Sequence, residues 1–149
     1  MSNDSRPRNA LEALDAHLHL ITRDIERWLT LFAEDAVVEF PYATGAKVPA
    51  RLVGKAAIRD YFSRTPDVFK DLRFRDVRRY ATTDPDLAIG EAHGSATIAT
   101  TSLPYEQDYV FFVHLRDGAI IRYREYWNVA AANESFGGLS QVASAMGAK

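Results

Sequence analysis

The spacing of hydrophobic residues in the first part of the chain predicts helices. Between residues 9 and 21, apolar side chains recur three and four residues apart and share one side of a helix: Leu11, Leu14, Leu18 and Ile21. Thr22 is then expected to cap a second helix, whose apolar side would contain Trp28, Leu29, Leu31 and Phe32. A third helix is predicted over 54–62, with Pro66 just beyond its end.

Further along, β-prone segments alternate with turns. A short strand is expected over 36–40, before Pro41, and a hairpin or irregular loop is expected over 42–53. Four longer strands are predicted over 72–82, 87–100, 105–115 and 119–128. Asp117-Gly118 is typical of a tight hairpin turn between the last two strands. A helical turn is expected over 129–136.

The order of these elements predicts the fold class. Helices come first and antiparallel strands follow, which favours an α+β fold with helices on one face of a curved sheet. Because the chain has 149 residues and no break in composition, we expect one domain over 9–138. Residues 1–8 and 139–149 are expected to be flexible tails.

The last predicted strand has one charged and one aromatic face. With a period of two residues, Ile120, Arg122, Arg124 and Tyr126 fall on one face. The opposite face contains Ile121, Tyr123, Glu125 and Trp127. If this second face covers the helices, aromatic rings surround Glu125 and little water reaches it.

The neighbouring strand is apolar on both faces. Tyr109, Phe111, Val113 and Leu115 lie on one face, and Val110, Phe112 and His114 lie on the other. Only one face can pack against the helices, and a large exposed apolar patch usually marks an association surface. We therefore predict a homodimer formed through the outer face of the sheet.

Composition narrows the function classes. The 18 basic and 20 acidic residues nearly balance, which gives no electrostatic reason to expect nucleic acid or an anionic membrane as a partner. With no cysteine, the chain has no thiolate nucleophile or zinc–thiolate site. No apolar run has the length of a signal peptide or a membrane span. We expect a cytoplasmic protein.

Glu125 is the first candidate for chemistry. Burial disfavours the charged form of a carboxyl group and raises its pKa, which suits a general acid or base. The alternative is a structural carboxylate paired with an arginine or with backbone amides. His93 is the second candidate, because Glu91 lies two residues away on the same strand face. Its alternative is a salt-bridged pair on the outer face of the sheet.

Aromatic residues could line a pocket, although most aromatic side chains simply form core. The candidates for ligand contact are Trp28, Phe40, Tyr42, Tyr61, Phe62, Tyr109, Tyr123 and Trp127, together with His17. His17 and His19 point in different directions on a helix and cannot chelate one metal ion. No phosphate-binding loop or dinucleotide motif is present, so we expect no cofactor and no metal.

Three segments resemble the nuclear transport factor 2-like superfamily, which includes ketosteroid isomerases and SnoaL-like cyclases. They are Trp28–Pro41, Gly54–Phe62 and Asp117–Asn128. The resemblance covers about residues 10–137 and implies a cone-shaped sheet wrapped around the N-terminal helices, with an internal pocket.

Within the superfamily, the chain is most similar to the PhzA/PhzB type of the SnoaL-like group. The similar positions are Thr44-Gly45, Pro49, 83–86, Glu91 and 124–128. The resemblance implies that Glu125 lies in a ligand cavity. In relatives similar to limonene-epoxide hydrolase, an aspartate at this place acts as a base on water.

The chain departs from each subfamily's catalytic set. The cavity histidine of the PhzA/PhzB type corresponds to Tyr61. The arginine and aspartate of the epoxide hydrolases fall near Ala92 and Gly94, and the ketosteroid isomerase base falls at Phe40. The isomerase's oxyanion tyrosine falls near 16–17.

Together these features favour an enzyme for a small, apolar, cyclic molecule. Glu125 would move a proton, while Tyr61, Tyr123 or His93 would orient or polarise the substrate. Isomerisation, cyclisation, dehydration and hydrolysis are all compatible with one buried carboxylate. The alternative is a non-catalytic protein that binds a small molecule or assists a biosynthetic pathway.

Overall fold

The computed structural model describes residues 6–43 and 48–147, so Thr44-Gly45 and most of the expected N-terminal tail lie outside the described residues. The strands are β1 (Phe32–Glu39), β2 (Arg51–Val53), β3 (Phe69–Ala81), β4 (Leu87–Ile98), β5 (Pro104–Arg116) and β6 (Ala119–Tyr126). The helices are α1 (Ala10–Leu20), α2 (Ile25–Leu29), α3 (Lys55–Phe62), α4 (Thr65–Val68), α5 (Val129–Phe136) and α6 (Leu139–Ala145). None of the described helices has the length and hydropathy of a membrane span.

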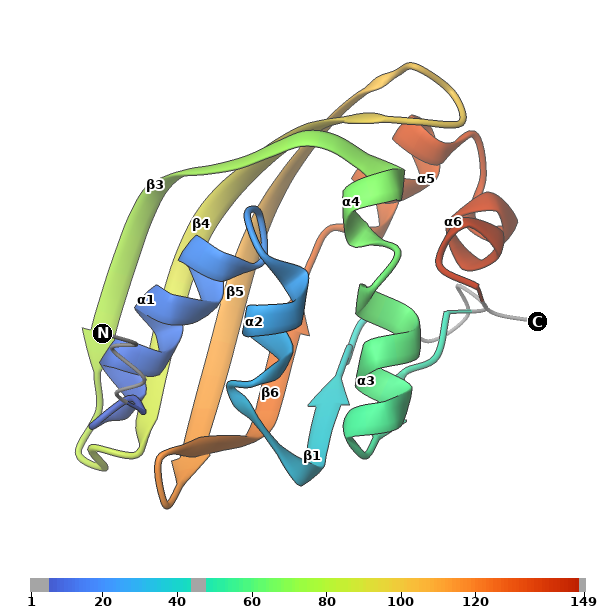
Figure 1. Cartoon of the computed structure of the whole chain (residues 1–149). Coiled ribbons are helices and arrows are strands. Elements are labelled where there is room, and N and C mark those ends of the chain that lie inside the picture. Colours follow the sequence, from blue (N-terminus) through green and yellow to red (C-terminus); the bar gives the residue numbers. More distant parts are fainter. Residues whose placement is uncertain (1–5, 44–47, 148–149) are drawn as a thin grey trace.

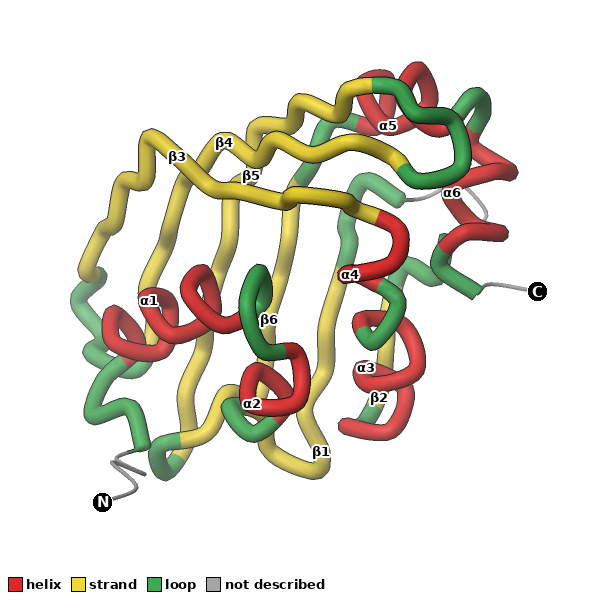
Figure 2. Tube along the Cα trace, turned by 45° about the horizontal axis from the view of Figure 1, so that its top comes forward, coloured by secondary structure: helices red, strands yellow, loops and turns green. Residues whose placement is uncertain are grey.

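The strands form one curved, unclosed sheet in the order β2-β1-β6-β5-β4-β3. All neighbouring pairs are antiparallel except β1 and β6, which are parallel. Helices α1, α2 and α3 lie on one side of the sheet, which curves around them, and α5 and α6 lie at one end (Figures 1 and 2). The predicted α+β fold class is confirmed.

The N-terminal helices begin at side-chain caps. The side chain of Asn9 accepts a hydrogen bond from the backbone N–H of Glu12 at the start of α1. The side chain of Asp24 does the same for Arg27 at the start of α2. Thr22 was the predicted cap of α2, but its hydroxyl donates to the carbonyl of His19 instead. The second helix is therefore shorter than predicted.

Strand β1 starts earlier than the sequence predicts. Its expected start was residue 36, but Phe32 already pairs with Ile120 of β6. The side chain of Phe32 is buried, so tertiary packing decides the conformation of a segment that also has helical periodicity. Of the hairpin or irregular loop expected over 42–53, the structure agrees with the hairpin, because β2 pairs antiparallel with β1.

Strand β6 contains a β-bulge. Because of this bulge, Ile120 lies on the opposite face of the sheet from the one that strict alternation predicts. Leu115 pairs with Ile120, whereas His114 pairs with Arg122, so Ile121 is an extra residue. As a result Ile120 is fully buried, although alternation assigned it to the outer face. Beyond the bulge the predicted alternation holds, and Tyr123 is buried.

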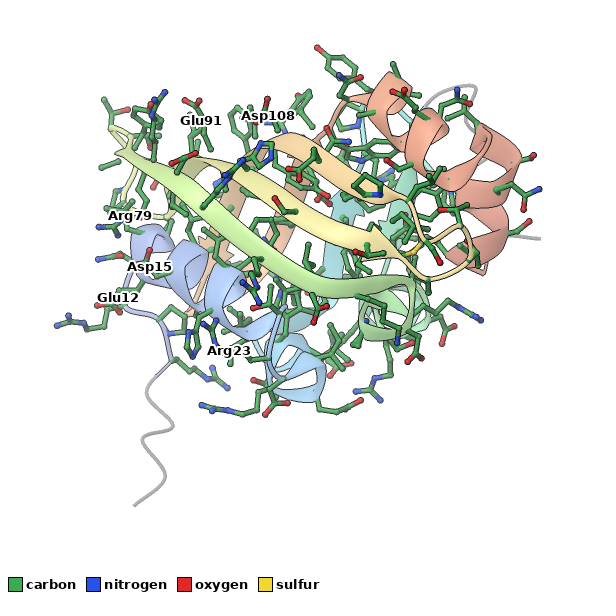
Figure 3. The ribbon with its side chains drawn as sticks, turned by 90° about the horizontal axis from the view of Figure 1, so that it is seen from above. Glu12, Asp15, Arg23, Arg79, Glu91 and Asp108 are labelled. Atoms are coloured by element: carbon green, nitrogen blue, oxygen red, sulfur yellow. The ribbon has the colours of Figure 1, made fainter. Side chains whose placement is uncertain are left out.

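Strand β3 forms one edge of the sheet and is irregular. Its pairing with β4 shifts register twice, next to Asp71 and Asp76, which have φ values of 55° and 54°. Arg79 binds Asp15 of α1 at 2.8 Å, and this ion pair joins the edge strand to the first helix (Figure 3). Such bulges and charges discourage pairing with another strand.

The C-terminal segment differs from the prediction of a flexible tail from residue 139. Residues Leu139–Ala145 form α6, and the side chains of Val142, Ala143 and Met146 are buried. Gly137 and Gly138, with φ values of 76° and 133°, form the turn between α5 and α6. The small residues were interpreted as a tail because their hydrophobic periodicity is short and weak.

Candidate active site

A small cavity lies between the helices and the concave face of the sheet. Its volume is about 70 Å³, which is small compared with sites for drug-sized ligands. The lining residues come from strands β3, β5 and β6, from helices α3 to α6, and from segments next to helices and strands. They are Ile21, Phe40, Tyr61, Phe62, Thr65, Phe69, Leu72, Phe74, Tyr105, Tyr109, Glu125, Trp127, Ala132, Phe136, Val142 and Met146.

Glu125 is the only carboxylate in this lining. Glu125 is partly exposed and lines the cavity, and protein atoms surround its carboxyl group. Burial raises the pKa of Glu125 to about 8. Among the described residues, no side chain or backbone group forms a hydrogen bond with this carboxyl group. The arginine pairing considered as the structural alternative is therefore absent from the described part of the chain.

Three tyrosines share the cavity with Glu125. The hydroxyl oxygens of Tyr105 and Tyr109 are 2.8 Å apart and hydrogen-bonded to one another. Burial, followed by the nearby Glu125 charge, raises the pKa of Tyr61 above its usual value. Burial is also the main reason why the pKa values of Tyr105 and Tyr109 are raised. These phenols therefore stay protonated near neutral pH and can donate hydrogen bonds.

Gly94 makes room for one of these tyrosines. A Cβ atom on Gly94 would lie 2.8 Å from Cε2 of Tyr109 and 3.3 Å from Cε1 of Phe74. A side chain at position 94 would therefore collide with aromatic rings of the cavity wall.

Five of the nine residues predicted to contact ligand line the cavity: Phe40, Tyr61, Phe62, Tyr109 and Trp127. Tyr42 does not line it, because its side chain is 63% exposed and packs against Tyr126 on the outer face. Its position after the end of β1 turns it away from the cavity.

Trp28, His17 and Tyr123 form a hydrogen-bonded core cluster instead of lining the cavity. Trp28 Nε1 donates to His17 Nδ1 at 2.8 Å, and His17 Nε2 lies 3.1 Å from the Tyr123 hydroxyl. Because indole can only donate, Nδ1 must accept, and neutral His17 therefore carries its proton on Nε2. Burial lowers the pKa of His17 to about 3, so it stays neutral.

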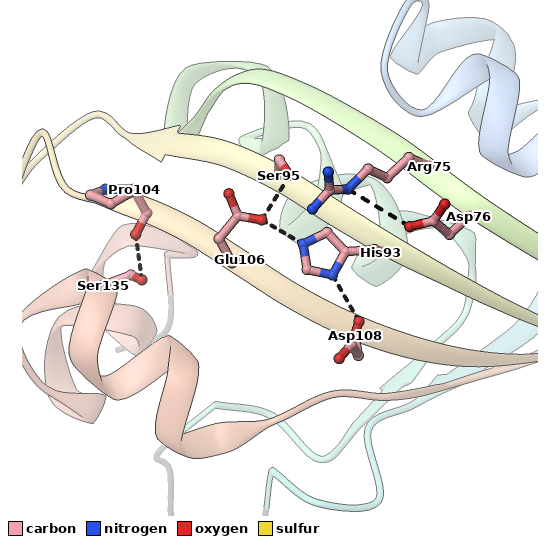
Figure 4. A network of polar contacts seen from close by, with 8 residues as sticks. All are labelled: Arg75, Asp76, His93, Ser95, Pro104, Glu106, Asp108 and Ser135. Carbon is pink, nitrogen blue, oxygen red and sulfur yellow. Dashed lines mark hydrogen bonds and ion pairs between the residues drawn. The ribbon is translucent and has the colours of Figure 1, made fainter.

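His93 lies on the outer face of the sheet, away from the cavity. Its Nδ1 is 2.8 Å from Asp108, and its Nε2 contacts Glu106, which also accepts from Ser95 (Figure 4). The contact with Glu106, followed by that with Asp108, raises the pKa of His93. The expected partner Glu91 is not in this cluster. The salt-bridged alternative describes His93 better, although its partners come from β5.

The sequence prediction missed several lining residues. Tyr105 lies four residues before Tyr109 on β5, and this even spacing could have placed both on one face. Val142 and Met146 were missed because their segment was interpreted as a tail. Phe69 and Leu72 lie at the start of β3, where the first register shift breaks simple alternation. Within the described residues, no group of three or more His, Asp or Glu side chains could hold a metal ion.

Comparison with known proteins identifies the family. The sequence profile of the SnoaL-like domain matches residues 9–123. This chain belongs to the SnoaL-like domain family. An uncharacterized PhzA/B-like protein of Pseudomonas aeruginosa is 39% identical over 137 residues, which are 91% of this chain and 95% of the relative. The predicted resemblance to the nuclear transport factor 2-like superfamily and its PhzA/PhzB type is confirmed.

Solved structures share this SnoaL-like fold. A Bacillus subtilis protein, provisionally described as an isomerase, has a TM-score of 0.80 at 38% identity and covers 87% of this chain and 93% of its own. A phenazine biosynthesis-related protein of Pseudomonas aeruginosa has a TM-score of 0.76 at 23% identity, over 87% of this chain and 82% of its own. At 23% identity, the similarity to the phenazine biosynthesis-related protein supports the fold alone.

Proposed function

We propose that this SnoaL-like protein is an enzyme of the isomerase or cyclase type, in which Glu125 moves a proton on a small, apolar, cyclic molecule. The observation that carries the proposal is the carboxyl group of Glu125, which has no hydrogen-bond partner among the described residues and is enclosed by aromatic rings. An unpaired carboxyl in such surroundings is costly and is typical of functional sites.

The raised pKa suits proton transfer near neutral pH. A general base works best when its pKa lies close to the operating pH, and burial brings the pKa of Glu125 to about 8. The same group can return the proton to another atom of the substrate, so the reaction needs no second acid. Isomerisation, cyclisation and dehydration all fit this scheme. The B. subtilis relative described as an isomerase supports it.

Binding without catalysis is the second candidate. The cavity of about 70 Å³ is small for a cyclic substrate, so the lining would have to move before a ring could enter. A protein that only held a ligand would use Glu125 to accept a hydrogen bond from a hydroxyl or an amine. The two candidates differ in whether a bound molecule exchanges protons with the protein.

A ligand screen followed by a proton-exchange assay tests the proposed function. Small cyclic ketones, phenols and amines are screened by thermal shift between pH 5 and 9, and bound ketones are assayed for deuterium uptake at the α-carbon by NMR. We expect uptake whose rate rises with pH and levels off above about 8. In Glu125→Gln we expect a loss of about 10²–10⁴-fold, the usual contribution of general acid–base catalysis.

A matched control separates this effect from a simple change of charge. Glu134→Gln removes one carboxylate from the exposed side of α5 and should leave the exchange rate unchanged. Binding without exchange at any pH would favour the non-catalytic candidate. Equal exchange in wild type and Glu125→Gln would contradict the role of Glu125.

We also propose that two copies of the chain associate through the outer face of the sheet. Val110, Phe112 and Tyr126 lie on this face and are only partly covered. The guanidinium of Arg124 lies 4.8 Å above the ring of Phe112, and its buried Nε has no hydrogen-bond partner in the described residues. A second copy would cover this apolar patch.

Sedimentation of a variant with a charge on the outer face of the sheet tests the proposed dimer. A charge at the centre of the apolar patch, as in Phe112→Asp, should shift the mass from dimer to monomer at micromolar concentration. Asn133→Asp, which adds a similar charge on the exposed side of α5, should leave the dimer intact. A wild-type chain that is monomeric at this concentration would overturn the proposal.

A further inference from the structure

An open groove runs between helix α1 and the edge strand β3. Its lining residues come from two segments, 15–23 and 72–77. The groove has a volume of about 580 Å³, which lies within the usual range of small-molecule sites and exceeds that of the cavity beside Glu125. Leu72 and Phe74 line both spaces and separate them. The groove is therefore a second space, on the outside of the cavity wall.

The floor of the groove is apolar, although it is open to solvent. Four side chains form it: Leu18, Leu72, Phe74 and Val77. The first three are half-buried, and Val77 is 43% exposed. Strict alternation would place Phe74 and Val77 on opposite faces of β3, but the register shift beside Asp76 brings both to the side of α1. An exposed apolar strip of this kind is typical of a binding surface.

Two arginines lie at one end of this floor. Arg23 and Arg73 both line the groove. Nη1 of Arg23 donates to the carbonyl of His19 at 3.0 Å and to the hydroxyl of Thr22 at 3.3 Å, which holds the guanidinium beside the end of α1. Neither arginine forms an ion pair within the described residues. A carboxylate bound here would supply the counter-charge, because a guanidinium can donate two parallel hydrogen bonds to it.

An ion pair closes the opposite end of the groove. Asp15 binds Arg79 at 2.8 Å, and Figure 3 shows the two residues together beside α1, with Arg23 further along the helix. Among the described residues, Asp15 is the only carboxylate that lines the groove, and Arg79 already neutralises it. The groove therefore has a positive end and a limited length, which suits a small molecule better than an extended peptide.

The neighbouring groove determines the direction in which an anion would bind. It shares Arg23 and Arg73 and continues from them toward α4. Three of its lining residues are acidic: Asp24, Glu26 and Asp71. These carboxylates repel an anion that moves past the arginines. A negative head group would therefore stay at the arginines, while its apolar tail extends the other way, toward Val77.

From these observations we propose that the groove between α1 and β3 binds a small amphipathic anion. Its carboxylate contacts Arg23 and Arg73, and its short alkyl or aryl tail covers the apolar floor. A second copy of the chain is a poorer occupant, because the register shifts and charges of β3 discourage pairing along this edge. The inference is independent of the proposed function, since neither the cavity nor Glu125 takes part in it.

The test uses octanoate as the probe and follows the backbone amide signals of the protein by NMR. We expect octanoate to shift the signals of residues 18–23 and 72–77. Octanol and octyltrimethylammonium have the same tail without the negative charge, so they should bind these residues more weakly. Because salt screens exposed charges, the affinity for octanoate should fall as sodium chloride is added.

Substitutions of exposed side chains test the contacts. Arg23→Gln and Arg73→Gln should each weaken octanoate binding about two- to fivefold, the usual effect of losing one exposed charge pair. Val77→Asp should weaken it as well, because it places a negative charge beside the tail. Arg78→Gln is the matched control, since Arg78 is an exposed arginine of β3 that does not line the groove.

Several outcomes would overturn the proposal. One is an equal affinity for octanoate in wild type, Arg23→Gln and Arg73→Gln. Another is a set of shifts confined to the cavity or to the outer face of the sheet. Failure of octanoate to bind at millimolar concentration would also contradict it, and so would equally tight binding of octyltrimethylammonium. Circular dichroism of each variant checks that the fold is retained.

Discussion

At pH 8, Glu125→Gln is expected to be more stable than wild type, while at pH 4 the two proteins should be nearly equal. The pKa of Glu125 is raised to about 8 in the folded protein, against an ordinary value of 4.5. Between these values unfolding releases a proton, so the stability contributed by the neutral acid is lost as the pH rises. Glutamine does not ionise and does not lose this contribution.

The expected difference in unfolding free energy depends on how far the pKa of Glu125 is raised and on how much solvent reaches its carboxyl group. The full shift would correspond to a few kcal/mol at most, and we expect about 2 kcal/mol at pH 8 because Glu125 remains partly exposed. Urea unfolding of both proteins at several pH values measures the difference. Glu134→Gln, on the exposed side of α5, should show no such trend. A difference that stays constant from pH 4 to pH 8 would show that the pKa of Glu125 is not raised.

The second large effect is expected for Trp28→Ala, which should destabilise the protein by about 3–5 kcal/mol. Trp28 is fully buried, and its ring packs against Phe32 and Phe62 with centroid distances of 4.7 Å. The substitution removes this volume and also the donor to His17 Nδ1. Trp28→Phe keeps most of the volume but leaves the buried nitrogen of His17 without its donor, which should cost about 1–3 kcal/mol.

The other tryptophan provides the matched control. Trp127 lines the cavity and is partly exposed, so Trp127→Ala should lose less stability than Trp28→Ala and should change ligand affinity more. Urea midpoints and titration with a ligand from the screen measure both effects. If Trp28→Ala reduced affinity with little loss of stability, Trp28 would be a pocket residue, as the sequence analysis first predicted.

The fold could be predicted where local signals agree with the tertiary structure. Helix α1 and the Asp117-Gly118 turn, with φ values of 53° and 78°, both lie where the sequence indicates. The predicted apolar stripe of α1 is only partly correct, because Leu14 is buried whereas Leu11 and Leu18 are half-buried. The β-bulge at Ile121 could not be predicted, because it depends on how two strands pair rather than on either sequence alone. The start of β1 was missed for a similar reason, since its pairing partner is 88 residues away at Ile120.

The candidate site was predictable in part. Glu125 could be selected because a single carboxylate on an aromatic face is unusual, and the structure places it in the cavity. The sequence could not show which aromatic rings have buried hydrogen-bond partners. Trp28 and Tyr123 are both linked to His17 and belong to the core, whereas Tyr61 lines the cavity. His93 was ambiguous because its partners lie on another strand.

The bulge at Ile121 also has a consequence for insertions and deletions in related genes. Ile120 and Tyr123 both face inward, because Ile121 between them is an extra residue without a partner in the pairing of β5 and β6. A lineage that lost this codon would retain the pairing of Ile120 and of Tyr123, and its carboxylate would still face the cavity. Loss of a residue between Tyr123 and Glu125 would instead turn the carboxylate to the outside. An alignment gap at Ile121 therefore leaves the direction of the carboxylate unchanged, whereas a gap between Tyr123 and Glu125 reverses it.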